Sequence, residues 1–256
     1  MTKESQLKAR IDKAVSVMTR PVREWPYPKV VVSIPLERTL SYAPEVLPSL
    51  VNIGQKGASV IWHPYAAVEV VRTHAVIRFL SDSRGWTHLL FLDSDHKHPA
   101  DIIERLCKWV FTEDEEPLIV SGCNFMRNPP YQPCWYLKNK DSKDLLEVPV
   151  KIPQGLIRGV GGVGGGSLLI SRKVFEKVPP PWFIKDYSEV MNDTWIGEDQ
   201  YFSRKMLEYG VEMCVDTGTV SPHMSVYGVG REQYEAWYEE HGFASLDDIA
   251  QGITKR

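Results

Sequence analysis

The sequence predicts an α/β protein with a mixed, mostly parallel sheet flanked by helices. Short apolar runs, which are typical of buried strands, alternate with segments whose apolar residues recur at helical spacing. The most apolar run, residues 88–92, ends directly at two carboxylates, Asp93 and Asp95. A chain that alternates strands with helices favours parallel pairing, because each helix carries the chain back to the edge where the previous strand began.

The predicted elements are separated by prolines and glycines. We expect helices at residues 5–19, 45–53, 69–80, 100–111, 172–177, 198–209 and 231–250. We expect strands at residues 29–34, 58–62, 88–92, 118–121, 167–170 and 211–216. Pro21 ends the first helix and Pro35 the first strand, since proline lacks the amide hydrogen that both structures require. Gly210 ends the helix that begins at Glu198.

The composition is that of an ordinary globular protein, with 43% hydrophobic and 25% charged residues among 256. A net charge of −3 provides no overall basic field for nucleic acid or anionic lipid. No run approaches the roughly 18–20 apolar residues of a membrane span, and the charged N-terminus lacks the apolar core of a secretory signal. No two of the four cysteines have CxxC spacing, and Cys107 and Cys214 lie in apolar patterns typical of reduced, buried thiols. We therefore expect a cytoplasmic protein.

The Asp93-Ser94-Asp95 turn is the first candidate for chemistry. Alternation along an extended chain would direct both carboxylates to the same side, and ligands of open α/β sheets bind just beyond the carboxyl ends of the strands. Two hard oxygen donors there suit a divalent cation that also holds a phosphate. An Asp turn followed by the cap of the helix after Pro99 is the alternative interpretation of the same residues.

The glycine-rich stretch 159–166 formally contains GxGxxG, but a dinucleotide fingerprint has a strand before it and a helix after it. Here a strand follows, and no Gly-Lys-Ser/Thr ends the stretch as it would in a P-loop. So many glycines predict either backbone that passes close to a ligand or backbone with positive φ. A flexible hinge explains the pattern equally well.

Two further motifs admit both a structural and a chemical role. Glu198 and Asp199 follow Gly197 at a predicted helix start, where acids favour the positive end of the helix dipole, and either acid could instead act as a general base. His223 follows a strand and the turn Ser221-Pro222. A lone histidine is usually structural, and His223 becomes a candidate ligand if the fold brings it to the Asp-x-Asp turn.

The order of these features resembles the GT-A-fold glycosyltransferases and is similar to family 2 enzymes, in particular the small stand-alone enzymes of phage and archaeal type. The resemblance covers about residues 29–225. The motifs that carry it are a buried strand ending in Asp-x-Asp, a Gly-rich segment before Ser-Leu-Leu-Ile-Ser-Arg-Lys-Val-Phe, then Pro-Trp-Phe, Gly-Glu-Asp, and a strand-Asp followed by a histidine. The resemblance implies one GT-A domain over residues 1–256, composed of an N-terminal helix (1–20), a nucleotide-sugar-binding half (21–125), an acceptor and catalytic half (126–225) and a helical tail (226–256).

The resemblance also implies a role for each matching residue. The metal, Mn²⁺ or Mg²⁺, would be bound by Asp93, Asp95 and His223. The nucleotide-sugar donor would be bound by Ser33, Ile34, Pro35, Arg72, Asp93, Ser94, Gly164, Gly165 and Gly166. The acceptor would be contacted by Trp182 and Trp195, and the catalytic base would be Asp199, with Glu198 as its alternative. One departure is that Val71-Arg72-Thr73-His74 stands where the family usually has Ala-Arg-Asn.

The activity that this resemblance implies is a metal-dependent, inverting transfer of a sugar from a nucleotide sugar, expected to be a UDP-sugar, to an acceptor hydroxyl. The acceptor is expected to be a glycan or a hydroxymethylated DNA base. For the DNA alternative, the aromatic segment Met126–Lys143 could form a local basic rim through Arg127, Lys138, Lys140 and Lys143. A solvent-exposed loop explains the same segment.

Three other classes of protein share some of these features. A haloacid-dehalogenase-type phosphatase would use Asp93 as its nucleophile, but the residues after Asp95 are His96-Lys97 rather than the expected Thr or Val, and no later Gly-Asp-x-x-x-Asp is present. A nucleotide-sugar-forming nucleotidyltransferase would have a Gly-rich phosphate loop after the first strand, which residues 34–38 do not provide. A carbohydrate-binding module would not require the Glu-Asp pair or the metal ligands.

Overall fold

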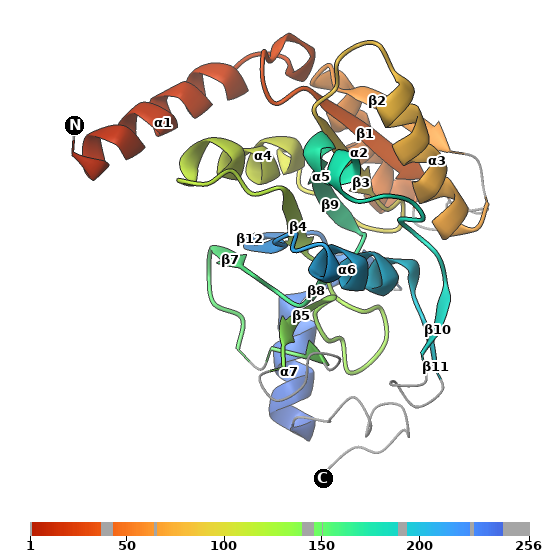
Figure 1. Ribbon diagram of the computed structural model, residues 1–256. Coiled ribbons are helices and arrows are strands. Elements are labelled where there is room, and N and C mark those ends of the chain that lie inside the picture. The colour runs from red at the N-terminus through yellow and green to blue at the C-terminus, as the bar shows by residue number, and fades with distance from the viewer. Residues whose placement is uncertain are drawn as a thin grey trace.

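A seven-stranded sheet forms the centre of the computed structural model, which describes residues 2–36, 43–63, 66–139, 146–149, 151–188, 194–225 and 228–242 (Figure 1). In sheet order its strands are β2 (Ser59–His63), β1 (Val30–Pro35), β3 (His88–Leu92), β9 (Ser167–Ser171), β4 (Ile119–Cys123), β12 (Cys214–Val220) and β7 (Leu156–Arg158). Strands β1, β2, β3, β4 and β12 run in one direction, and β9 and β7 run antiparallel to their neighbours. The predicted mixed, mostly parallel sheet is therefore confirmed.

Helices cover both faces of this sheet, because its strands are apolar on both sides. Within β3, Leu89 and Phe91 join one buried cluster, and Leu90 and Leu92 join the other. The first cluster is completed by α3 (Val68–Ser81), α5 (Arg172–Lys177) and α6 (Glu198–Glu208). The second is completed by α1 (Lys3–Met18), α2 (Ala43–Gln55) and α4 (Ile102–Thr112). The result is a three-layered arrangement of helices, sheet and helices.

Smaller elements surround the main sheet. A short 3-10 helix, η1 (Val22–Glu24), follows α1. The additional strands, which the sequence patterns did not reveal, are β5 (Trp135–Lys138), β6 (Leu146–Glu147), β8 (Gly162–Val163), β10 (Asp186–Ser188), β11 (Thr194–Ile196), β13 (His223–Met224) and β14 (Gly228–Val229). They have two to four residues each, too few for an alternating pattern to be recognised in the sequence.

The two ends of the described chain lie at opposite sides of the molecule (Figure 1). Helix α1 extends beyond the sheet and packs on α4, where Arg10 pairs with Asp114 at 2.6 Å. Helix α7 (Arg231–His241) adds Tyr234 to the first buried cluster, and the Tyr234 hydroxyl donates to the Pro149 carbonyl. Among the helices of the described residues, none combines the length and apolar character that crossing a bilayer requires.

Two predicted elements differ from the structure by more than two residues at one end or at both. The strand expected at 211–216 begins only at Cys214, because the amide of Val211 donates to the Met206 carbonyl and closes the end of α6 around Gly210, whose φ is +61°. The helix expected at 231–250 ends at His241, where Gly242 adopts a φ of +72°. Residues 243–256 lie outside the described part of the chain.

A charged cluster lies at the start of β3, at the opposite edge of the sheet from the carboxyl ends of the parallel strands. The carboxylate of Glu116 accepts a hydrogen bond from the Tyr27 hydroxyl and lies 3.3 Å from Lys173 Nζ and 3.6 Å from His88 Nε2. Burial acts to raise the pKa of Glu116, but the nearby His88 imidazole and the hydrogen bond from Tyr27 outweigh it and lower the pKa from 4.5 to about 2. The ionised carboxylate therefore stabilises the fold.

We expect Glu116→Gln to lower the free energy of unfolding at pH 7 by about 2 kcal/mol, since it removes a hydrogen-bonded charge. A carboxyl group whose pKa is depressed in the folded protein contributes stability above its unfolded pKa and loses it as the pH falls. The difference between variant and wild type should therefore shrink between pH 4.5 and about 2, as measured by urea unfolding. Glu176→Gln, which removes an exposed partner of Arg172, is the matched control and should change stability by less than about 0.5 kcal/mol. A loss from Glu116→Gln that stays constant with pH would contradict this account.

Candidate functional site

The candidate site lies at the edge of the sheet where the parallel strands end. Asp93 follows β3, and His223 begins β13 shortly after the end of β12. Because β9 is antiparallel to β3, its first residue pairs with the last residue of β3, and the Asp93 amide donates to the Gly166 carbonyl at 3.0 Å. The reversed strand thus brings the end of the glycine-rich segment to the Asp-x-Asp turn.

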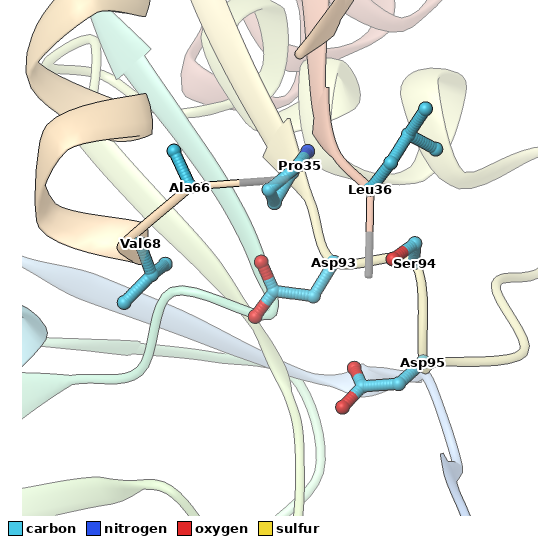
Figure 2. Close-up of a pocket in the computed structure, with 7 residues that line it drawn as sticks. All are labelled: Pro35, Leu36, Ala66, Val68, Asp93, Ser94 and Asp95. Atoms are coloured by element: carbon cyan, nitrogen blue, oxygen red, sulfur yellow. The ribbon is translucent and has the colours of Figure 1, made fainter. Parts of the chain in front are cut away.

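A pocket of about 190 Å³ opens beside this turn (Figure 2). It is lined by Pro35, Leu36, Ala66, Val68, Asp93, Ser94 and Asp95, so three of the predicted donor-binding residues, Pro35, Asp93 and Ser94, share one cavity. The carboxylates of Asp93 and Asp95 point to the same side of the turn in this view. Ser33 and Ile34, also predicted to contact the donor, are fully buried within β1.

Arg72 is a buried cation that links the Asp-x-Asp turn to α6. Its Nη2 donates to both carboxylate oxygens of Asp93 at 3.0 and 3.1 Å, and its Nε lies 3.3 Å from Glu198 Oε1. The side chain is only 3% exposed. Burial acts to lower the pKa of Arg72, but Asp93 and Glu198 outweigh this and raise it, so the guanidinium stays charged. Glu198, predicted as the alternative base, is thus the ion-pair partner of a buried arginine.

The glycine-rich segment permits several side chains to approach the backbone closely. A Cβ on Gly165 would lie 1.4 Å from Arg72 Nη1, which leaves no space for any side chain. A Cβ on Gly166 would lie 3.0 Å from His96 Nε2, and one on Gly164 would lie 2.8 Å from the Cβ of Cys134. Gly164, Gly165 and Gly166 have no positive φ. Of the alternatives that the sequence left open, close approach explains these three positions, and the groups that approach are side chains of the protein itself.

Asp199 lies in the first turn of α6 and faces this segment. Its Oδ2 is 3.8 Å from the position of a Cβ on Gly164, while its Oδ1 accepts a hydrogen bond from the amide of the next residue at 2.8 Å. Ser203 fixes the helix here, because its hydroxyl accepts from the Val163 amide at 3.0 Å and donates to the Asp199 carbonyl at 2.8 Å. A carboxylate is thereby held beside the glycines.

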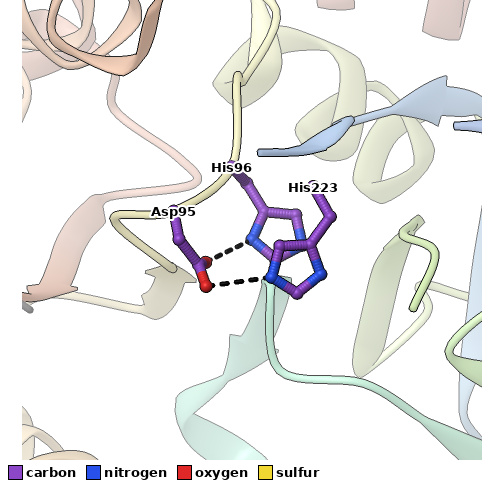
Figure 3. Close-up of side chains that lie close together, drawn as sticks. All are labelled: Asp95, His96 and His223. Atoms are coloured by element: carbon purple, nitrogen blue, oxygen red, sulfur yellow. Dashed lines mark hydrogen bonds and ion pairs between the residues drawn. The ribbon is translucent and has the colours of Figure 1, made fainter. Parts of the chain in front are cut away.

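Asp95, His96 and His223 form a group that could hold a metal ion (Figure 3). One potential ligand atom from each lies within 4.8 Å of the other two. Asp95 Oδ1 is 2.8 Å from His96 Nδ1, Asp95 Oδ2 is 2.9 Å from His223 Nε2, and the two imidazoles stack with centroids 4.2 Å apart. The backbone brings them together, since the amide of Met224 donates to the Asp95 carbonyl and that of Lys97 donates to the Pro222 carbonyl.

Hydrogen bonding orients the His223 ring as in many metal sites. Its Nδ1 is 3.1 Å from the Phe125 carbonyl oxygen, which can only accept, so Nδ1 carries a hydrogen. In the neutral ring, the form that binds metals, Nε2 then presents a lone pair towards the lone pairs of Asp95 Oδ2. Two such atoms attract a cation between them. A carboxylate with imidazole nitrogens suits several divalent transition metals, Mn²⁺ included, so the residues present fit the expected metal.

His98, from the same loop, is hydrogen-bonded to the Asp-x-Asp turn through one of its ring nitrogens and to Ser221 through the other. Its Nε2 donates to the Asp93 carbonyl at 2.9 Å, and its Nδ1 accepts from the Ser221 hydroxyl at 3.0 Å. Burial, with the nearby His96 imidazole as a smaller cause, lowers the pKa of His98 to about 3, so it is neutral and can accept the hydroxyl proton. The imidazole thereby links the turn after β3 to the segment after β12.

The structure therefore groups the predicted site residues differently from the sequence. Asp93 bonds to Arg72, whereas the cluster of possible ligands contains Asp95 and His223 together with His96, which the sequence analysis did not select. The signal for His96 was its place directly after Asp95. Arg127, which the sequence suggests for a basic rim, donates from Nη2 to Asp95 Oδ2 at 2.6 Å.

Of the two predicted acceptor residues, the structure describes the side chain of Trp182 alone. Trp182 exposes 6% of its surface, packs edge-on against Phe175 at 5.6 Å between ring centroids, and donates from Nε1 to the Val178 carbonyl. Trp195 belongs to β11, and its side chain lies outside the described part of the structure.

Comparison with known proteins yields likenesses of fold. No model of a protein family matches the sequence, and no curated protein matches it. Among solved structures, protein A197 from STIV matches with a TM-score of 0.53 and 20% identity over 77% of this chain and 85% of that one. The likeness to A197 shows a shared fold.

Two solved glycosyltransferases also match, at lower TM-scores. A glucosyl-3-phosphoglycerate synthase from Mycobacterium tuberculosis, solved with Mn²⁺, UDP-glucose and phosphoglyceric acid, has a TM-score of 0.43 and 11% identity over 88% of this chain and 80% of that one. The mannosyltransferase PcManGT from Pyrobaculum calidifontis, solved with GDP-mannose and Mn²⁺, has a TM-score of 0.41 and 12% identity over 91% of this chain and 67% of that one. These likenesses concern the fold alone.

We expect Gly165→Ala to lower the free energy of unfolding by about 3 kcal/mol, because the added methyl group displaces the Arg72 guanidinium and leaves Asp93 and Glu198 buried without their partner. Chemical denaturation measures the change. Gly54→Ala is the control, since Gly54 lies in α2 with no heavy atom within 4 Å of an added Cβ, and it should gain about 0.5–1 kcal/mol. Equal effects of the two substitutions would contradict the described packing of Arg72.

Proposed function

We propose that the protein is a metal-dependent glycosyltransferase that moves a sugar from a nucleotide sugar to an acceptor hydroxyl. The observation that carries the proposal is the convergence of three different groups at one sheet edge. These are the ligand cluster Asp95, His96 and His223, the pocket beside Asp93, and the Asp199 carboxylate next to Gly164. Each group matches one requirement of the reaction: a cation for the diphosphate, a cavity for the donor and a base for the acceptor.

The metal ligands of this proposal are Asp95, His223 and His96, with Mn²⁺ or Mg²⁺ as the ion. When bound, a divalent cation acts as a Lewis acid and stabilises the negative charge that grows on the departing diphosphate. Asp93, whose two oxygens accept from Arg72, would line the donor pocket, and the ion would be held by the other three residues. Arg72 would keep the Asp93 carboxylate fixed at the pocket wall, and Ser94 and Pro35 would line the same wall.

Asp199 is the proposed catalytic base. Its Oδ2 lies beside Gly164, whereas the neighbouring carboxylate of Glu198 is paired with Arg72. A base on the far side of the sugar from the diphosphate would remove the acceptor proton during in-line attack, which inverts the anomeric configuration. We therefore infer an inverting enzyme, and we propose a UDP-sugar as its donor because the family resemblance of the sequence implies one.

The proposed acceptor is a glycan or a hydroxymethylated DNA base. Of the basic residues that could line a path for DNA, Lys138 ends β5 and Arg127 reaches the metal ligands, whereas Lys140 and Lys143 lie outside the described residues. A phosphatase with Asp93 as nucleophile is less compatible with the geometry, since a nucleophilic carboxylate oxygen must be open to substrate and both oxygens of Asp93 accept from Arg72.

Calorimetry with a panel of nucleotide sugars in the presence of Mn²⁺ tests the donor. One nucleotide sugar should bind, and adding EDTA should abolish its binding and its hydrolysis. An acceptor screen with glycans and with hydroxymethylated DNA then identifies the product. Turnover of p-nitrophenyl phosphate without any nucleotide-sugar binding would instead establish the phosphatase.

We expect Asp199→Asn to lower kcat by about 10²–10⁴-fold, because the amide cannot accept the acceptor proton, while the affinity for UDP with Mn²⁺ stays unchanged. Steady-state kinetics and calorimetry measure the two quantities. Glu208→Gln, at the last residue of the same helix, is the control and should leave both unchanged. A parallel loss of UDP affinity in Asp199→Asn would argue against a purely catalytic role.

We expect Asp95→Asn to weaken Mn²⁺ binding by at least about 10-fold, since the substitution replaces the one carboxylate of the ligand cluster by a neutral amide. The electron paramagnetic resonance signal of free Mn²⁺ measures binding directly, without a turnover assay. Asp82→Asn, which alters an exposed turn paired with Arg84, should bind Mn²⁺ like the wild type. Unchanged binding in Asp95→Asn would remove Asp95 from the metal site.

A further inference from the structure

The guanidinium of Arg127 contacts the two atoms that the proposed metal ion requires. Its Nη2 lies 2.6 Å from Asp95 Oδ2 and 3.1 Å from His223 Nε2, and these two atoms are themselves 2.9 Å apart. One nitrogen of a cation thus bridges the carboxylate oxygen and the imidazole nitrogen. The Arg127 side chain is 32% exposed, so part of it reaches the surface of the protein.

A metal ion and this guanidinium cannot use the same lone pairs together. Nη2 has two hydrogens, one suited to Asp95 Oδ2 and one to the lone pair of a neutral His223 Nε2. A divalent ion bound to these atoms would occupy the same side of them and would repel the positive charge of Arg127. Binding of the ion therefore requires that the guanidinium withdraw from both contacts.

We propose that Arg127 competes with the divalent ion for Asp95 and His223, so that the protein's own cation sets a threshold for metal binding. The inference rests on the proposed metal site but not on the glycosyltransferase activity. A planar guanidinium also pairs well with phosphate oxygens. Arg127 would thus shield Asp95 and His223 while no ion is bound, and could pair with an anionic ligand once the ion has displaced it from these two residues.

The test measures Mn²⁺ affinity without donor or acceptor, by the paramagnetic resonance signal of free Mn²⁺ and by calorimetry. Arg127→Gln should bind Mn²⁺ about 10-fold more tightly than the wild type, since the competing charge is removed. Arg127→Lys retains a positive charge and should remain within about threefold of the wild type. Arg84→Gln removes the same charge from an exposed turn before β3, remote from the strand ends, and controls for the change in net charge.

Equal or weaker Mn²⁺ binding in a folded Arg127→Gln variant would overturn the competition. A second measurement uses nuclear magnetic resonance of the unaltered protein. The ¹⁵N signal of the Arg127 guanidinium is assigned as the one that Arg127→Lys removes. Adding Mg²⁺ should relieve the restricted rotation of this guanidinium. A signal that stays restricted at saturating Mg²⁺ would also overturn the inference. Asp95→Asn separates the competition by Arg127 from the metal site on which it rests. Equal Mn²⁺ binding by this variant and the wild type would refute the metal site itself.

Discussion

The guanidinium of Arg72 lies between two carboxylates that come from distant parts of the chain, Asp93 after β3 and Glu198 at the start of α6. All three groups are largely buried, and an unpaired charge in the protein interior would be strongly unfavourable. The arginine therefore determines how the Asp-x-Asp turn and the α6 start sit relative to each other. Arg72 also requires a glycine at position 165, since its guanidinium leaves no space there for a side chain.

This arrangement separates two neighbouring pairs of acids that look equivalent in the sequence. Asp93 and Glu198 compensate the buried arginine, whereas Asp95 faces His96 and His223, and Asp199 faces Gly164. Burial raises the pKa of Asp93 and of Glu198, and the charge of Arg72 acts in the opposite direction on both. In each pair, one acid compensates the buried arginine, and the other faces the groups on which the proposed function depends.

The antiparallel strand β9 is what makes the site compact. Inserted between β3 and β4, it begins at the edge where its neighbours end, and so it places Gly166 against Asp93. A parallel strand at this position would have brought its carboxyl end, and not the glycines before it, to the turn. The same edge receives His223 from the far side, through the backbone hydrogen bonds that link residues 95–97 to residues 222–224.

The sequence by itself determined the α/β class, most of the large elements and the place of the Asp-x-Asp turn, because apolar periodicity and proline or glycine boundaries are local signals. The strand at 88–92 and the helix at 172–177 have the predicted limits. Only the tertiary structure decided which acid meets which partner. The contacts of Arg72 with Glu198, of Asp95 with His223 and of Arg127 with His223 join residues about 100 or more positions apart. The direction of β9 likewise depends on its neighbours in the sheet, since one strand's own pattern is the same in either direction.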